Sequence, residues 1–260
     1  MEKISKSQVK LVKSLQLKKF RDELGLFVAE GEKCVDELRK SFELVHLYRE
    51  GENASRTEIE QMSGLRTPQG VIAVFKKQSY SEAVLQRQRS NSDSGLTGEA
   101  GLILALDAIQ DPGNLGTIIR TCDWFGVHDI VCSLDTADCY NPKVVQATMG
   151  ALARVRVHYV DLPAWLAEQQ CAIFGTLLDG KDMYEVLTAK RSNSEAVCAL
   201  SAQRSVIVMG NEGNGISPAV RSLVTLPIRI PSYPKNAETS ESLNVSIATA
   251  IVLAEFRRNL

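Results

Sequence analysis

Three segments of this sequence place polar side chains, and in the first two also glycines, directly after an apolar run, a composition suited to holding a ligand. They are DAIQDPGNLGTIIRTCDWFGV (107–127), VIVMGNEGNGIS (206–217) and IRIPSYPKNAETSESLNVSIATAI (228–251). Glycine lets backbone amides and carbonyls approach a ligand closely, because it carries no side chain. The polar residues of these segments are therefore candidates for chemistry: Asn114, Arg120, Glu212, Ser242 and Asn244.

The apolar run before the first segment, LILAL (102–106), predicts a strand. The segment itself predicts a loop and then a helix with two distinct faces. The apolar face consists of Leu115, Ile118, Ile119, Cys122 and Phe125, and the opposite face of Thr117, Arg120, Thr121 and Trp124. Asn114 is placed to cap this helix and Gly126 to end it. Arg120 then projects from the second turn, near the carboxyl end of the strand, where ligands of open α/β sheets bind.

Each candidate also has a purely structural interpretation. Asn114 and Arg120 would be a cap and a surface arginine. Glu212 would cap a helix opening at Ser217, and Ser242 and Asn244 would cap the C-terminal helix. Neither G-x-G-x-x-G nor a phosphate-loop lysine follows the glycines, so a nucleotide phosphate is not the expected ligand.

The remaining composition excludes several classes of protein. The chain has 260 residues, of which 44% are hydrophobic and 23% charged, as in ordinary globular proteins. It has no apolar run near the ~20 residues of a membrane span, and its first residues lack the apolar core of a signal peptide. The three histidines, His46, His128 and His158, show no metal-binding spacing, so we expect no metal. The six cysteines form no C-x-x-C pair and indicate reduced, buried thiols in a cytoplasmic protein: Cys34, Cys122, Cys132, Cys139, Cys171 and Cys198.

The pattern of apolar runs predicts two α/β domains. Residues 1–76 form a small one, and residues 77–100, rich in Ser, Gln and Gly, form a linker. From residue 101 to 260, continuous apolar strands alternate with helices, which indicates a parallel sheet covered on both faces.

The net charge of −1 hides a basic N-terminus. Residues 1–21 contain seven lysines and arginines, the last of them Arg21, against Glu2 alone. An amphipathic helix at the start of this segment would carry Lys3, Lys6, Lys10 and Lys13 on one face and Ile4, Leu11 and Leu15 on the other. This face is either an ordinary solvated surface or an electrostatic footprint for a nucleic-acid backbone.

Taken in order, NLGTIIR, GNEGNGIS and IPSYPKNAETSESLNVSIA resemble the SpoU (TrmH-like) class of RNA ribose 2′-O-methyltransferases, within the SPOUT superfamily. The segments LKKFRDELGLFVAEGEKCVDEL and TPQGVIAVF resemble the substrate-binding domain that precedes the catalytic domain in many ribosomal RNA members. The resemblance implies a deep trefoil knot, a homodimer with its active site near the subunit interface, and S-adenosylmethionine as cofactor. The expected substrate is RNA, most simply ribosomal RNA.

The resemblance also implies roles for individual residues. Arg120 would activate the ribose hydroxyl, and because an arginine does not easily lose its proton, charge stabilisation and phosphate anchoring are favoured over base catalysis. Asn114 would orient Arg120 or the ribose, and Glu212, Ser242 and Asn244 would complete the site. Cofactor contacts are expected from Gly210, Ile230, Leu243 and Thr176, with Asn211 and Gly213 beside them.

Two departures from the family pattern concern this site. The loop SYPKNAET is a few residues longer than usual, and Thr148-Met149 replaces a serine followed by a small residue. Alternatives to the main hypothesis are a silent RNA-binding or ribosome-assembly factor, a transfer RNA methyltransferase, and a dinucleotide-dependent enzyme. The last lacks the glycine fingerprint and its acidic partner.

Overall fold

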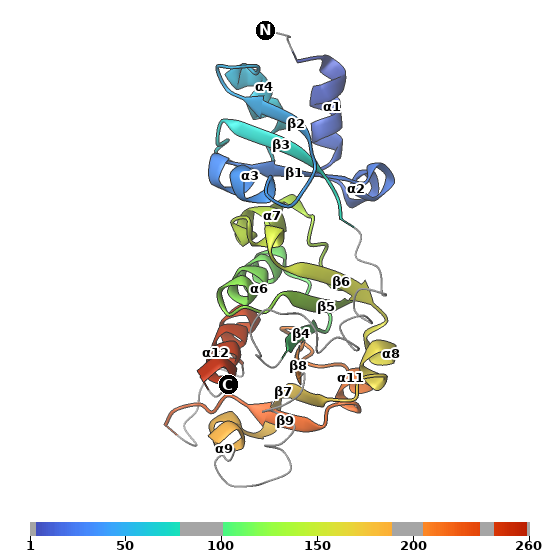
Figure 1. The fold of residues 1–260 in the computed structure, drawn as a ribbon, viewed down its shortest axis with the longest axis vertical. Coiled ribbons are helices and arrows are strands. Elements are labelled where there is room, and N and C mark those ends of the chain that lie inside the picture. Colours follow the sequence, from blue (N-terminus) through green and yellow to red (C-terminus); the bar gives the residue numbers. More distant parts are fainter. Residues whose placement is uncertain (1–3, 79–100, 189–204, 235–241, 259–260) are drawn as a thin grey trace. The chain divides into compact units, whose positions relative to one another are not determined.

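The computed structural model describes residues 4–78, 101–188, 205–234 and 242–258. Its chain forms two compact units (Figure 1). The first comprises Met1–Ser79, Asp111–Arg120 and Ala137–Val155, and the second comprises Tyr80–Gln110, Thr121–Thr136 and Arg156–Leu260. The expected linker lies outside the described residues except for Lys77 and Gln78, as do Lys3 and Cys198.

The first unit is built on a three-stranded antiparallel sheet of order β1-β3-β2. Its elements are α1 (Lys6–Ser14), α2 (Lys18–Leu24), β1 (Leu26–Glu30), α3 (Glu32–Leu38), β2 (Leu44–Arg49), α4 (Arg56–Met62), β3 (Val71–Lys76), α7 (Pro142–Thr148) and most of α6 (Pro112–Trp124). Val12 and Leu15 of the N-terminal segment pack with Val28, Ile59 and Ile72 in its core. The small N-terminal domain expected from the sequence is therefore present.

The predicted N-terminal amphipathic helix is present as α1, and a second helix, α2, follows it after a break. Leu17 between them is extended and 60% exposed. The break leaves backbone carbonyls without helical partners, and the Arg21 guanidinium satisfies them: its Nη1 lies 2.9 Å from the carbonyl oxygens of Leu15 and Gln16. Arg21 itself is 1% exposed and also donates to the carboxylate of Asp138. It therefore belongs to the interior and not to the basic surface.

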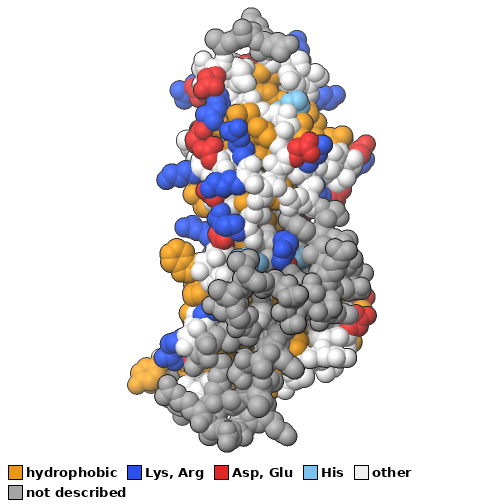
Figure 2. Space-filling model, in the orientation of Figure 1, with side chains coloured by type: hydrophobic (Ala, Val, Ile, Leu, Met, Phe, Trp, Pro, Cys, Tyr) orange, Lys and Arg blue, Asp and Glu red, His pale blue; other side chains and the backbone are white. Residues whose placement is uncertain are grey.

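The exposed charges of the first unit fall into two kinds. Along the edge formed by α3 and α4, basic and acidic side chains alternate (Figure 2), and ion pairs such as Arg49–Glu32 and Arg56–Glu60 join them. Helix α1, in contrast, contains three lysines and no acidic residue. These lysines, Lys6, Lys10 and Lys13, are all exposed, as predicted.

The second unit contains a six-stranded sheet of order β6-β5-β4-β8-β7-β9, in which every neighbouring pair is parallel. Its elements are β4 (Leu102–Leu106), β5 (Asp129–Ser133), β6 (Arg156–Val160), α8 (Leu162–Ala167), β7 (Ala172–Asp182), α9 (Met183–Thr188), β8 (Ser205–Met209), α11 (Pro218–Arg221), β9 (Leu226–Arg229) and α12 (Val245–Arg258). All residues of β4, β5 and β8 are buried, which confirms the expected parallel sheet. Among the described helices, none combines the length and apolarity needed to cross a bilayer.

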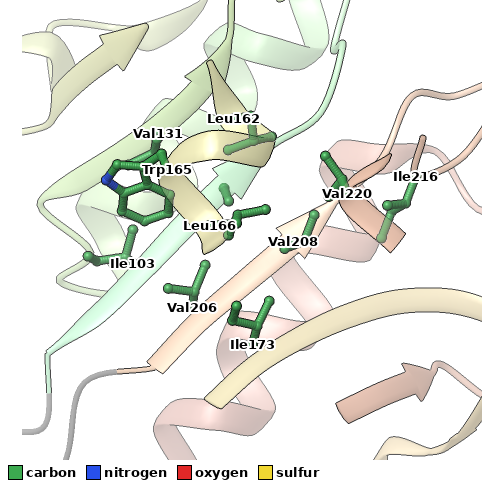
Figure 3. Close-up of a cluster of buried hydrophobic side chains, with 11 residues drawn as sticks. Ile103, Val131, Leu162, Trp165, Leu166, Ile173, Val206, Val208, Ile216 and Val220 are labelled. Carbon is green, nitrogen blue, oxygen red and sulfur yellow. The ribbon is translucent and has the colours of Figure 1, made fainter. Parts of the chain in front are cut away.

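Helices cover both faces of this sheet (Figure 1). On one face, Trp165 of α8 and Val220 of α11 pack against strand residues such as Val206 (Figure 3). On the other, Phe174 of β7 meets Phe256 of α12 edge-on, with ring centroids 4.9 Å apart. Because successive residues of a strand point to opposite faces, neighbouring strand residues supply both cores.

The strand order reverses beside β4. The chain first runs outward from β4 to β5 and β6, and then crosses to build β7, β8 and β9 on the other side of β4. Loops leaving the carboxyl ends of β4 and β8 therefore start side by side and diverge. Ligands of open α/β sheets bind at such a reversal.

Candidate active site

Helix α6, which carries Arg120, begins three residues earlier than predicted. Asp111 and not Asn114 caps it: the Asp111 Oδ1 accepts from the Asn114 backbone nitrogen at 2.8 Å, and the Asp111 carbonyl accepts from Leu115. Pro112 occupies the first helical position, where its missing N–H has no intrahelical partner to lose. Asn114 thus lies in the first turn of the helix, with its side chain not required as a cap.

The two faces of α6 are as predicted. Leu115, Ile118, Ile119 and Cys122 are fully buried, whereas Thr117, Arg120 and Trp124 are exposed and Phe125 is half-buried. Arg120 contributes nothing to the buried stripe. Its guanidinium is therefore presented to solvent from a helix that is held by other residues.

Gly116 within α6 and Gly126 just beyond its end have structural reasons. A Cβ on Gly116 would lie 2.5 Å from the Ala147 Cβ and 2.8 Å from the Val144 carbonyl oxygen, so its absence allows α6 and α7 to pack closely. Gly126 ends the helix with a φ of +66°, as predicted. The backbone bond from Val127 to the Cys122 carbonyl, at 2.8 Å, completes this helix end.

The loop after β8 is closed on itself by Asn211. The backbones of Asn211 and Gly215 exchange two hydrogen bonds of 2.9 Å, and the Asn211 Oδ1 accepts from the amides of Gly213 and Asn214. A Cβ on Gly210 would lie 2.4 Å from the Gly215 carbonyl carbon. Any larger residue at position 210 would therefore clash with the backbone where the loop folds back. Glu212 and Gly213 are exposed at the tip.

The same loop is tied to the corner that follows β4. The Asn211 Nδ2 donates to the Ala108 carbonyl at 2.7 Å, and the Ala108 amide donates to the Ser133 hydroxyl at 2.8 Å. Ala108 has a φ of +58°, a left-handed conformation that is unusual for a residue with a Cβ. The buried Asp107 carboxylate accepts from the Ser217 amide at 2.7 Å. Ser217 directly precedes α11, so Asp107, and not Glu212, makes this bond at the start of that helix.

Sequence reasoning missed Asp107, Ala108 and Ser133 as members of the site. A usable signal was present. Asp107 directly follows β4 and Ser133 ends β5, and the carboxyl ends of neighbouring parallel strands meet at one edge of a sheet.

Three of the expected cofactor residues lie on neighbouring strands or directly after them, and Thr176 comes just after Gly175, the last residue of β7 that pairs with β8. Gly210 follows β8, Ile230 lies just beyond β9, and Thr176 of β7 pairs with Ile228 of β9. The Thr176 hydroxyl donates to the Val208 carbonyl at 3.1 Å. Backbone groups beside half-buried apolar side chains suit an adenosine, whose faces are apolar and whose edges form hydrogen bonds. The donor set therefore fits the expected cofactor.

Asn244 caps α12, so the structural interpretation is confirmed for this residue. Its Oδ1 accepts from the Ser246 amide at 3.0 Å and from the Ser246 hydroxyl at 2.6 Å, and its carbonyl accepts from Ala248. Ser242 and Leu243 precede it and are exposed, Leu243 to 49%.

The structure thus sorts the candidates into three groups. Gly210, Asn211, Glu212 and Gly213 share one loop next to Thr176 and Ile230. Ser242, Leu243 and Asn244 stand together at the entrance of α12, in the same unit. Asn114 and Arg120 belong to the first unit, on α6.

Two of the buried cysteines, Cys34 and Cys122, are unsuited to nucleophilic chemistry at neutral pH. Cys34, Cys122, Cys132 and Cys139 are buried, and Cys171 is half-buried. Burial raises the pKa of the Cys34 thiol to about 11 and that of Cys122 further still, because a thiolate would be poorly solvated there.

Comparison with known proteins decides the family. The model of the SpoU rRNA Methylase family matches residues 101–254, and that of the MRM3-like substrate binding domain matches residues 6–60. The chain belongs to the SpoU rRNA methylase family. It is thus an RNA methyltransferase that uses S-adenosylmethionine, and the resemblance drawn from the three segments is confirmed.

Individual relatives agree along the whole chain. The 23S rRNA (guanosine(2553)-2′-O)-methyltransferase RlmP of Bacillus subtilis is 28% identical, over 99% of this chain and 98% of its own. A TrmH-family protein from Porphyromonas gingivalis is 32% identical with a TM-score of 0.78, covering 100% of both chains. An AdoMet-bound rRNA methyltransferase from Sinorhizobium meliloti is 28% identical with a TM-score of 0.79, covering 100% of this chain and 97% of its own.

Proposed function

We propose that this SpoU-family enzyme methylates the 2′-hydroxyl of one ribose in ribosomal RNA. The observation that carries the proposal is Arg120, a solvent-exposed guanidinium on the polar face of a helix whose other face is fully buried. The Bacillus subtilis relative, named for methylation of a 23S rRNA guanosine ribose, supports the substrate class.

In this proposal Arg120 stabilises the charge that develops on the ribose oxygen and anchors a neighbouring phosphate. A guanidinium suits both tasks, because its planar fork donates several hydrogen bonds and stays protonated. Asn114, two turns earlier on α6, orients Arg120 or the ribose. Glu212 at the loop tip and Ser242 and Asn244 at the entrance of α12 complete the RNA side of the site.

The cofactor would be held by Gly210, Ile230, Leu243 and Thr176, with Gly213 and Asn211 in the same loop. When bound it supplies an activated methyl group on a sulfonium. The chain's own task is to align the ribose oxygen and to exclude water, and alignment of two reactants removes a large part of such a barrier. No metal is required for this displacement.

The domain roles follow the same proposal. Residues 1–76 bind the RNA substrate through the lysines of α1, and residues 101–260 carry out catalysis. Residues 77–100 connect these two domains. The family's trefoil knot and homodimer, with the active site near the subunit interface, remain predictions, as does a cytoplasmic location.

The test is transfer of labelled methyl to ribosomal RNA isolated from cells that lack the gene, followed by mass-spectrometric mapping of the modified ribose. One modified nucleotide in ribosomal RNA is expected. Methylation of transfer RNA alone would overturn the substrate class. Tight ribosomal RNA binding without any transfer would favour the silent assembly factor.

A further inference from the structure

The side chain of Asn211 connects the two loops that diverge where the strand order reverses. Its Oδ1 accepts from two amides of its own loop, and its Nδ2 reaches across to the Ala108 carbonyl at 2.7 Å. The Asn211 side chain therefore spans the loop after β8 and the corner after β4, in addition to the bond between the Ser217 amide and the Asp107 carboxylate. Within the described part of the chain, the last backbone hydrogen bond between these two segments runs from the Asp107 amide to the Met209 carbonyl.

Asn211 has little capacity left for a ligand. Its backbone N–H and carbonyl are both paired with Gly215, and both acceptor positions of Oδ1 are occupied. A side-chain amide carries two N–H donors and accepts two hydrogen bonds, so one Nδ2 hydrogen is all that remains. The residue is built to hold the loop, not to bind a cofactor or RNA.

The corner that Asn211 grips is a conformation that needs support. Ala108 lies in the left-handed region, which costs an L-residue roughly 1–2 kcal/mol. Its amide and carbonyl are both held from outside, by Ser133 and Asn211. Ser133 in turn donates to the Asp135 carboxylate at 2.6 Å, so the support extends to the residues just after the neighbouring strand β5. Strained conformations persist where surrounding structure over-determines them, typically at functional sites.

We infer that Asn211 is a positioning residue for the methyl-transfer reaction: it fixes the loop that presents Glu212 and, through the Ala108 carbonyl, the corner that leads three residues later to the cap of α6. This inference rests on the proposed function and adds a residue that acts without touching the reactants. It also reassigns Asn211 from the cofactor contacts suggested by its place beside Gly210.

The informative variant is Asn211→Asp, with Asn214→Asp as its matched control. Aspartate keeps both oxygen acceptors for the loop amides but places a carboxylate oxygen against the Ala108 carbonyl, where a donor is required. Asn214 is exposed in the same loop, and its backbone amide, not its side chain, makes the contact to Asn211. The control therefore adds the same charge and leaves the bridge intact.

Hydrogen exchange of the full-length protein provides the first measurement. In Asn211→Asp the amides of Ala108 to Gln110 are expected to exchange faster than in the wild type, and in Asn214→Asp they are expected to stay protected. Unchanged protection in Asn211→Asp would overturn the bridge whether or not the protein methylates RNA, so the inference and the proposed function fail separately.

Single-turnover methyl transfer at saturating cofactor and RNA provides the second measurement. Misplacement of a reacting group by about 1 Å costs on the order of 100-fold, so a loss of that size is expected for Asn211→Asp. In a Glu212→Ala background the same change is expected to slow the reaction by a smaller factor, because the part of its effect that passes through Glu212 is already lost. Fully additive losses of rate from the two substitutions would overturn the positioning role. So would a loss of rate that weaker binding of S-adenosylhomocysteine explains wholly while the Ala108 amide stays protected.

Discussion

Arg21 and Arg120 belong to the same compact unit and occupy opposite environments. Arg21 is 1% exposed and donates four hydrogen bonds, two to the Asp138 carboxylate and two to main-chain carbonyls. Arg120 stands exposed on a helix whose packing does not involve it. Both count equally in a tally of basic residues, yet one is part of the fold and the other is available to a substrate.

The comparison teaches that basic residues must be sorted by their partners before they are assigned to RNA. A buried guanidinium is tolerated only when its charge and donors are satisfied. An exposed one gains little from the fold and is free to serve function. Substitutions at the two positions should therefore change different measurements.

The largest effect is expected for Arg21→Ala. Removing one partner of a buried ion pair leaves the Asp138 charge uncompensated and destabilises a protein by about 3–5 kcal/mol. Urea unfolding followed by circular dichroism would measure this loss. Arg39→Ala, at an exposed arginine of the same unit, is the control and should stay within about 0.5 kcal/mol of the wild type. Equal stability of the two variants would remove the distinction between buried and exposed arginines.

Arg120→Ala should reverse this pattern. Methyl transfer is expected to fall on the order of 100- to 1000-fold, as when a charge stabiliser is lost from a preorganised site, while unfolding stays unchanged. Arg120→Lys should also fail, since lysine keeps the charge but loses the planar fork. Single-turnover transfer to ribosomal RNA and calorimetry with S-adenosylhomocysteine would separate rate from cofactor binding. A folded Arg120→Ala protein with a near-normal rate would make the helix merely structural.

The lysines of α1 sharpen the comparison on the RNA side. Changing Lys6, Lys10 and Lys13 together to Gln should weaken RNA binding and flatten its dependence on salt, because each lost phosphate contact lowers the log–log slope by about 0.7–0.9. The matched control changes three exposed basic residues of the α3 region, Lys33, Arg39 and Lys40. If both triple variants bind with the same slope, α1 is not the electrostatic platform.

The smallest effect is expected at Asn244. Replacing it with Ala removes the cap of α12 and should cost about 1 kcal/mol of stability, measured by thermal unfolding. Ser242→Ala, two residues earlier and outside the cap, should leave the unfolding temperature unchanged. A larger loss of methyl transfer than of stability in Asn244→Ala would add a role in the site to its role as a cap.

Much of this arrangement was readable from the sequence. Runs such as LILAL and SVIVM predict fully buried parallel strands, and the spacing of Leu115, Ile118 and Ile119 predicts the buried face that leaves Arg120 outside. Gly126 was identified as the helix end, because only a left-handed residue closes a helix in that way.

The failures have physical causes. Asp and Asn are both good caps, so residue type alone does not choose between Asp111 and Asn114; Pro112, which fits the first helical position, favours Asp111. The burial of Arg21 could not be read from periodicity, because its partner Asp138 lies 117 residues further along the chain. The Asn211–Ala108 bridge likewise joins residues 103 apart, and only the order of the strands brings them together.

The separation of Arg21 and Asp138 along the sequence also has a consequence for biosynthesis. The first unit is assembled from segments that end at Val155, so its N-terminal sheet cannot complete its packing when residue 79 leaves the ribosome. At the usual ~5–20 residues per second, the stretch from residue 79 to Asp138 takes roughly 3–12 s to synthesise, and during that time Arg21 lacks its carboxylate partner. The nascent N-terminal segment therefore waits with a basic, incompletely packed surface next to the ribosome, whose RNA is the class of molecule that we propose the finished enzyme modifies.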